Sequence, residues 1–212
     1  MINAITIIKK KQHLTYQKFQ NYWKNEHAAI VTRSPLVGTY VQSHPIYNDI
    51  LTFEDTIDGI AEIWFDDTNA MRTLAATKEY EDIQDDEKVF IDGSAVRLVI
   101  AEDIITIDGD VSDYKLLIFM NKSSVVELTN FREELISIAS RYSKQNLKRM
   151  KVSLPKLAGY KNDKNPEWDA VLTIWLDFKA DQQYIDDVVS DFFYFSNNII
   201  AKLCNSVVIQ EK

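Results

Sequence analysis

The segment from Asp58 to Asp66 reads Asp-Gly-Ile-Ala-Glu-Ile-Trp-Phe-Asp and is the clearest strand signal in the chain. A turn-forming Asp-Gly pair begins it, an acidic pair follows it, and apolar, mostly β-branched and aromatic residues fill the interval. Neither alternate set of side chains is polar throughout, so we expect a central strand that is covered on both faces. Its one internal ionisable side chain, Glu62, is costly to bury without a partner.

A weaker copy of this strand occurs later in the chain, where Ile174-Trp175-Leu176-Asp177 parallels Ile63-Trp64-Phe65-Asp66. Trp64 and Trp175 are 111 residues apart (175 − 64 = 111). Two further pairs share this separation: Ile7 with Ile118, and Val96 with Val207. One separation in three elements indicates an internal duplication.

The sequence around each copy predicts the order β-α-β-β-α-β, which is the ferredoxin-like unit. In the first half we expect strands at 3–8, 37–46, 58–66 and 94–101, with helices after Thr15, after Asp67 and over 78–88. In the second half we expect strands at 114–120, 151–160, 168–177 and 203–209, with helices over 125–142 and 184–201. The acidic segment 107–113 is interpreted as a linker, so the predicted domains are 1–106 and 114–212.

Both helices of such a unit cover the same face of its four-stranded sheet, and the other face is left bare. Two bare faces that pack together bury each other. The predicted fold is therefore α+β, with two tandem ferredoxin-like βαββαβ units whose sheets pack face to face as a barrel-like core.

The composition is acidic, with a formal net charge of −8 over 212 residues, and this argues against a nucleic-acid partner. The one cysteine, Cys204, lies in an apolar segment, so we expect a small buried side chain and not a nucleophile. No apolar run approaches membrane-spanning length, and the N-terminus has no signal-peptide pattern. We expect a cytoplasmic protein without a membrane partner.

Signals for metals and cofactors are missing from the sequence. The histidines, His13, His27 and His44, are scattered, and no His-x-His or Cys-x-x-Cys spacing occurs. Neither a glycine-rich phosphate loop nor a nucleophile elbow is found. We therefore expect no metal and no organic cofactor.

His27 is the leading catalytic candidate. It shares one face of its predicted helix with Phe19 and Trp23, and this face should lie toward the sheet. An imidazole near its ordinary pKa suits proton transfer at neutral pH. A core histidine that is hydrogen-bonded to the backbone fits the same pattern, and the pattern by itself favours this structural role.

Glu62 is the second candidate, and two orientations are open. If the side chains at 61, 63 and 65 face the helices, Glu62 and Trp64 point into the interior between the sheets. The opposite orientation turns Glu62 toward His27. In a purely structural role, Glu62 would pair with Arg97 or Arg33.

Three polar residues of the preceding strand, Tyr40, Gln42 and His44, share one parity. Grouped with Glu62 and Trp64 they would form a polar cluster with aromatic walls. That composition is typical of a ligand pocket.

Several motifs of the first half follow one another in a fixed order: Phe19, Tyr22-Trp23, His27-Ala28, Pro35, 40–44, 58–66 and 90–92. This series spans about residues 1–103 and resembles the EthD family of the dimeric α/β-barrel superfamily. The second half lacks counterparts of Trp23 and His27. We interpret it as a degenerate copy that replaces a partner subunit, so we expect an intramolecular dimeric α/β barrel that is a monomer or a weak homodimer.

The superfamily includes cofactor-free monooxygenases of aromatic polyketides, polyketide cyclases, lyases, haem-degrading enzymes and stress-response proteins, so only this analogy points to haem. The resemblance thus implies a cofactor-free enzyme that acts on a small apolar or aromatic carbonyl compound, with His27 as proton shuttle and Glu62 as a second catalytic residue. The expected substrate-binding residues are Trp23, Tyr40, Gln42, His44 and Trp64. The alternative is a non-catalytic protein that binds a small ligand or serves in a stress response.

Overall fold

The computed structural model describes residues 1–46, 57–144, 146–160 and 165–212. The first half contains β1 (Ile2–Ile8), α1 (Tyr16–Tyr22), a π-helical turn (Trp23–His27), α2 (Ala28–Val31), β2 (Tyr40–Pro45), β3 (Gly59–Phe65), α3 (Thr68–Leu74), α4 (Lys78–Phe90) and β4 (Arg97–Ile107). The second half contains β5 (Tyr114–Lys122), α5 (Leu128–Arg141), β6 (Leu147–Pro155), β7 (Ala170–Leu176), α6 (Gln182–Phe193) and β8 (Ser196–Gln210). None of these helices is long and apolar enough to cross a membrane.

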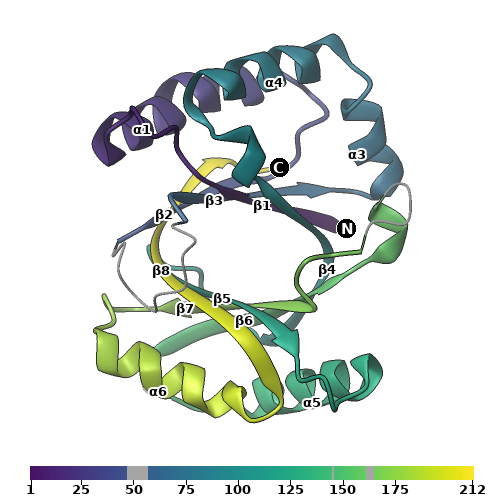
Figure 1. Ribbon diagram of the computed structural model, residues 1–212, viewed down its shortest axis with the longest axis vertical. Helices are drawn as coiled ribbons and strands as arrows, with labels where there is room; N and C mark the ends of the chain where they lie inside the picture. Colours follow the sequence, from purple (N-terminus) through teal and green to yellow (C-terminus); the bar gives the residue numbers. More distant parts are fainter. Residues whose placement is uncertain (47–56, 145, 161–164) are drawn as a thin grey trace.

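The eight strands of the described ranges form one closed antiparallel barrel in the order β1-β3-β2-β8-β5-β7-β6-β4. Helices α1 to α4 cover the first-half strands from outside, and α5 and α6 cover those of the second half (Figure 1). The fold is α+β. The predicted face-to-face packing needs one correction: β2 pairs with β8 and β4 pairs with β6, so hydrogen-bonded seams join the two sets of strands. These seams leave no open sheet edge.

Helix starts follow the sequence signals. The Thr15 hydroxyl accepts the Lys18 N–H at 3.3 Å and caps α1. The Asp67 carboxylate accepts two N–H groups, both at 2.8 Å, and caps α3. The buried faces of these helices meet the outer face of β1 to β4.

Three apolar cores organise the molecule. One lies under α5 and α6, a second lies under α1 to α4, and a third lies inside the barrel. The interior core includes Ile5, Ile60, Phe119 and Cys204, and it fills one end of the barrel. Cys204 is fully buried as predicted, and burial raises the pKa of its thiol to about 12.

Several element boundaries differ from the predictions. The strand predicted at 151–160 lies at 147–155. The predicted helix 184–201 ends at Phe193, because β8 must be long enough to pair with β5 over 196–205 and with β2 over 204–210. The last strand of the first half extends to Ile107 instead of ending at Ala101. Its extra residues pair with β6 and carry Asp103 into the sheet.

The separation of 111 residues holds for Trp64 and Trp175 but not for β1 and β5, the first strands of the two halves. Ile5 lies opposite Glu62, and Leu117 lies opposite Thr173. Ile5 therefore corresponds to Leu117, which is 112 residues later (117 − 5 = 112). The predicted match of Ile7 with Ile118 is wrong, because Ile7 lies inside the barrel and Ile118 lies under the helices.

Gly59 begins β3 where the chain has no room for a side chain. A Cβ there would lie 2.5 Å from Cζ3 of the fully buried Trp23. We predict that Gly59→Ala lowers the free energy of unfolding in urea by about 1–3 kcal/mol, because the indole cannot move aside without disturbing the core. Gly93→Ala is the control, since a Cβ there meets nothing within 4 Å. Equal losses in the two variants would contradict this packing.

Candidate functional site

Two cavities lie on opposite faces of the first-half strands. A cavity of about 150 Å³ lies between the helices and the outer face of the barrel wall, and we call it the His27 pocket. A cavity of about 630 Å³ lies inside the barrel at one end, and we call it the barrel cavity. Strand register separates them: Val41 lies opposite Glu62 and faces inward with it, whereas Tyr40 lies opposite Ile63 and faces the helices.

The π-helical turn Trp23–His27 shapes the His27 pocket. The Trp23 carbonyl accepts a hydrogen bond from the N–H of Ala28, five residues later in the chain, and a second one from Nε2 of Gln42 at 2.9 Å. Such insertions in a helix are frequent at functional sites. Here the turn places both Trp23 and His27 on the face that lines the pocket.

His27 is buried, and Nδ1 lies 2.7 Å from Oδ2 of Asp86 on α4. The Tyr22 hydroxyl donates to the other carboxylate oxygen of Asp86 at 2.6 Å. A carboxylate at Nδ1 holds the proton on that nitrogen and leaves Nε2 as an acceptor. Among the residues the structure describes, Nε2 of His27 has no hydrogen-bond partner, so it is available to a ligand.

Two groups of the His27 pocket can exchange a proton near neutral pH. Burial lowers the pKa of His27 below 6.5, although Asp86 opposes the shift, so the imidazole is neutral at pH 7. Burial and then Asp86 raise the pKa of Glu87 to about 7. Glu87 lines both this pocket and a surface groove, so it can also exchange protons with solvent. Perturbed groups that share a pocket point to acid-base chemistry.

Of the predicted binding residues on β2, one lines the His27 pocket and two lie behind it. Tyr40 lines the pocket, and its hydroxyl accepts a hydrogen bond from Nε2 of Gln42 at 2.9 Å. Burial raises the pKa of this hydroxyl, so Tyr40 keeps a proton to donate. Gln42 and His44 do not line the pocket. His44 contacts Gln42 at 3.1 Å and the Trp23 ring at 4.7 Å, and burial and then Lys24 lower its pKa to about 4.

The barrel cavity lies above a buried ionic network. Glu62 pairs with Lys115 and, at 3.0 Å, with Lys151. Lys151 also pairs with Asp103 at 2.9 Å. Burial by itself would raise the pKa of the Glu62 carboxyl, but Lys115 and Lys151 outweigh it and lower the pKa to about 2. The four groups come from β3, β4, β5 and β6, so the network joins the two halves across the barrel.

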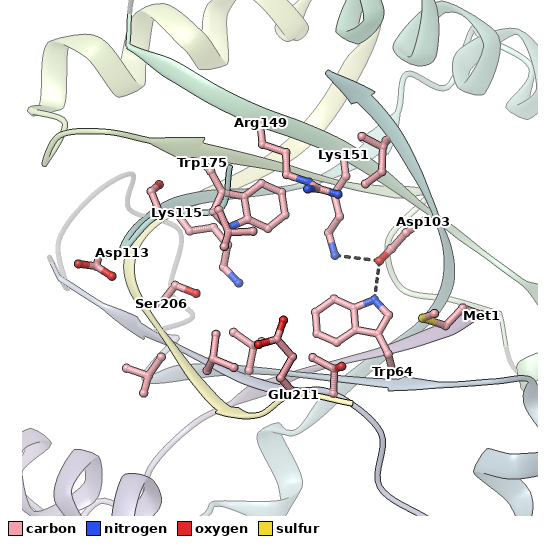
Figure 2. A pocket seen from close by; sticks show the side chains of 17 residues that line it. Met1, Trp64, Asp103, Asp113, Lys115, Arg149, Lys151, Trp175, Ser206 and Glu211 are labelled. Carbon is pink, nitrogen blue, oxygen red and sulfur yellow. Dashed lines mark hydrogen bonds and ion pairs between the residues drawn. The ribbon is translucent and has the colours of Figure 1, made fainter. Parts of the chain in front are cut away.

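Aromatic residues of both halves wall the barrel cavity. Figure 2 shows Trp64 on one side of the open space, with Trp175, Arg149 and Lys151 on the other. The Trp64 Nε1 donates to Asp103 at 2.8 Å. Lys151 Nζ lies 4.6 Å from the centre of the Trp64 ring, which is a cation–π distance.

The single cluster predicted from the sequence is wrong in its geometry. The structure brings Trp23, His27 and Tyr40 together in one pocket and places Glu62 and Trp64 in the other cavity. Tyr40, Gln42 and His44 have the opposite parity to Val41, which shares the inner face with Glu62. Glu62 therefore cannot orient His27.

The predicted partners of Glu62 are also wrong. Arg97 pairs with Glu167 at 3.2 Å, and in the described part of the chain both ion-pair partners of Glu62 come from the second half. The sequence does carry the signal for one of them. Lys115 interrupts the apolar strand 114–120, so the argument that a buried charge needs a partner applies to it as it does to Glu62.

Other functional candidates had no sequence signal. Asp86 and Glu87 belong to an acidic helix and cannot be told from solvent-exposed carboxylates before the helix is docked. Asp103 lies between the predicted strand 94–101 and the predicted linker 107–113, so the sequence does not indicate that its side chain joins the ionic network. Within the described ranges, no group of three or more His, Cys, Asp or Glu side chains is placed to hold a metal ion.

The ion pairs of Glu62 make the stability of the protein depend on pH in the acid range. The pKa of the Glu62 carboxyl falls from 4.5 to about 2 on folding. The contribution of these ion pairs to the free energy of unfolding is therefore complete above pH 4.5 and is lost as the pH falls toward 2. We predict a loss of about 3 kcal/mol in the free energy of unfolding over this range, measured in urea. This part of the pH dependence should be missing in Glu62→Gln. Glu102→Gln removes an exposed carboxylate and should keep it; an unchanged profile in Glu62→Gln would refute the assignment.

Comparisons with known proteins agree with this architecture. An anthrone oxidase-like protein aligns with a TM-score of 0.63 at 8% identity, covering 99% of this chain and 94% of its own. A monooxygenase candidate from Fusobacterium nucleatum aligns at 0.60 and 10% identity, covering 99% and 92%. A monooxygenase candidate from Lactobacillus acidophilus NCFM aligns at 0.53 and 12% identity, covering 99% of both chains. At these identities the likeness shows the fold.

Sequence comparison gives the family of the first half. No curated protein matches the chain. The EthD domain family matches residues 11–94, the segment that holds α1, the π-helical turn, β2, β3 and α4. Residues 11–94 thus match the EthD domain family, and they lie in a chain with the dimeric α/β-barrel fold.

Proposed function

We propose that this protein is a cofactor-free enzyme that transfers a proton on a small aromatic or other apolar carbonyl compound bound in the His27 pocket. The observation that carries the proposal is the His27–Asp86 pair, 2.7 Å apart, in a pocket with apolar and aromatic walls and with Nε2 left to the ligand. The same arrangement of carboxylate and imidazole serves proton transfer in unrelated enzymes.

The size and lining of the pocket limit the substrate. A volume of about 150 Å³ is the scale of a cavity that holds one benzene ring. Most of the wall is apolar, with Val31, Ala61, Ile63, Phe65 and Leu74 among its members. The proposed substrate is therefore a single-ring aromatic or equally small apolar ketone, ester or aldehyde.

The chemistry uses three side chains. Nε2 of His27 takes a proton from the carbon next to the carbonyl, and the C–H electron pair forms an enolate. Asp86 stabilises the resulting imidazolium, while Tyr40 donates a hydrogen bond to the carbonyl oxygen. Protonated Glu87 returns a proton to the enolate carbon in the second half of the cycle, and the His27 imidazolium then gives its proton to the Glu87 carboxylate, which restores both groups. Removal of this proton is a first step shared by cyclase, lyase and monooxygenase chemistry, and two of the similar structures carry monooxygenase names.

The assembly follows from the repeated element order. We infer that each half is a ferredoxin-like unit and that the second unit stands in for a partner subunit, so the protein works as a monomer or a weak homodimer. In the second half, Phe131, Leu135 and Ala139 of α5 fill the space under the helices. This packing supports a single active site per chain.

The proposed reaction predicts exchange of a carbon-bound proton with solvent. We expect the protein to catalyse hydrogen–deuterium exchange at the α-carbon of single-ring aryl ketones in D₂O, followed by NMR. His27→Ala should lower the rate by roughly two orders of magnitude or more, with unfolding unchanged, because the base is lost. His13→Ala, in a loop, is the control. Tight binding of the ketones without exchange would instead support the non-catalytic ligand-binding alternative.

The pH dependence of kcat/KM should be bell-shaped. Activity rises as His27 loses its proton below pH 6.5 and falls as Glu87 ionises near pH 7. Asp86 raises the pKa of both groups, so Asp86→Asn should move both limbs to lower pH. A profile in which neither limb moves would exclude Asp86 from the catalytic apparatus.

A further inference from the structure

The barrel cavity is independent of the proposed active site. It lies on the other face of the β1-β3-β2 wall and is about four times larger, at 630 Å³ against 150 Å³. Exposed side chains at its rim, including Met1, Asp113 and Glu211, mark the open end of the barrel (Figure 2). The interior core around Phe119 fills the opposite end. The cavity is therefore a blind pocket that a ligand can enter from one side.

In the deep part of this cavity, away from the rim carboxylates, the unused hydrogen-bonding groups of the ionic network are donors. Lys115 and Lys151 carry three N–H donors each, and the network uses one of Lys115 and two of Lys151. The carboxylates are better satisfied, because Asp103 also accepts from Trp64, Ser153 and Asn3. A ligand that forms hydrogen bonds with the unused N–H groups of Lys115 and Lys151 must supply acceptor atoms such as oxygens.

The charge balance favours an anion. Three cations line the cavity, Lys115, Lys151 and Arg149. Away from the rim, the buried Glu62 and the half-buried Asp103 offset two of these charges, which leaves one positive charge in the deep part of the cavity. Arg149 pairs with Asp108 at 3.4 Å, and that carboxylate is 86% exposed and screened by water. The rim carboxylates Asp113 and Glu211 are exposed, so they oppose a ligand charge at the mouth more than one held deep inside.

The walls favour a flat, aromatic ligand. The Lys151 Nζ lies 4.6 Å from the centre of the Trp64 ring and 5.9 Å from that of Trp175, so both indoles border the place where a ligand would meet the ammonium group. Indole faces stack on planar rings. Aromatic faces with a few convergent polar groups are the composition of small-molecule sites.

We propose that the barrel cavity binds a planar aromatic monoanion. Its carboxylate or phenolate oxygen accepts hydrogen bonds from Lys115 and Lys151, and its ring system packs against Trp64 and Trp175. The volume admits two or three fused rings, which the His27 pocket is too small to hold.

The probe for this site is 2-naphthoate, with 2-naphthylmethanol as the neutral analogue of the same shape. Isothermal titration of the full chain should show one naphthoate site, with quenching of tryptophan fluorescence and at least tenfold weaker binding of the alcohol. Lys115→Met should abolish the preference for the anion. Equal affinity for the two compounds, or no binding of naphthoate, overturns the proposal.

Because Lys115→Met removes a partner of the buried Glu62, a second variant leaves the ionic network intact. Ser206→Trp fills the cavity from β8, and Asn205→Trp, on the exposed face of the same strand, is its matched control. Ser206→Trp should lose naphthoate binding at least tenfold and keep ketone exchange, whereas Asn205→Trp should keep both. His27→Ala should abolish exchange and leave naphthoate binding unchanged. Loss of naphthoate binding in His27→Ala, or its persistence in Ser206→Trp, would place the ligand elsewhere.

Discussion

The ion pairs of Glu62 with Lys115 and Lys151 are the constraint on which the arrangement of the molecule depends. All three side chains are at most 2% exposed, so none of the charges can be left without its partner. Removing one partner of a buried pair costs about 3–5 kcal/mol, whereas the complete network roughly offsets its own desolvation. The carboxylate belongs to the first half and the ammonium groups to the second. The two halves therefore have to close on each other for either to bury its charge.

Closure of the barrel divides the chemistry between two faces of one wall. Alternation along β2 and β3 sends Glu62 and Trp64 inward, while Tyr40 and Ile63 face the helices. The outer pocket is small and apolar, with a neutral imidazole held by a carboxylate. The inner cavity is larger, charged and aromatic. Because a strand has a period of two, a single register produces both environments from neighbouring residues.

The two halves contribute unequally to these sites. The π-helical turn and the His27–Asp86 pair belong to the segment that matches the EthD domain family, whereas the second half packs its helices directly onto its strands. The second half nevertheless supplies the three basic side chains that line the barrel cavity, Lys115, Arg149 and Lys151. The second half, which the sequence predicts to be a degenerate copy, therefore lines one of the two cavities.

Much of the fold was determined by local sequence. Caps at Thr15 and Asp67, the apolar strand 59–65 and its copy around Trp175 predicted the element order, because each depends on neighbours a few residues away. The burial of His27 against the sheet was likewise predictable from helical spacing. Only the tertiary structure decided the seams of the barrel, the parity of β2, the length of β8 and the partners of His27 and Glu62. Asp86 is 59 residues from His27, and Lys151 is 89 residues from Glu62. No local pattern selects one carboxylate or lysine among many at such separations; the closed barrel does so by placing two charges where water cannot reach them.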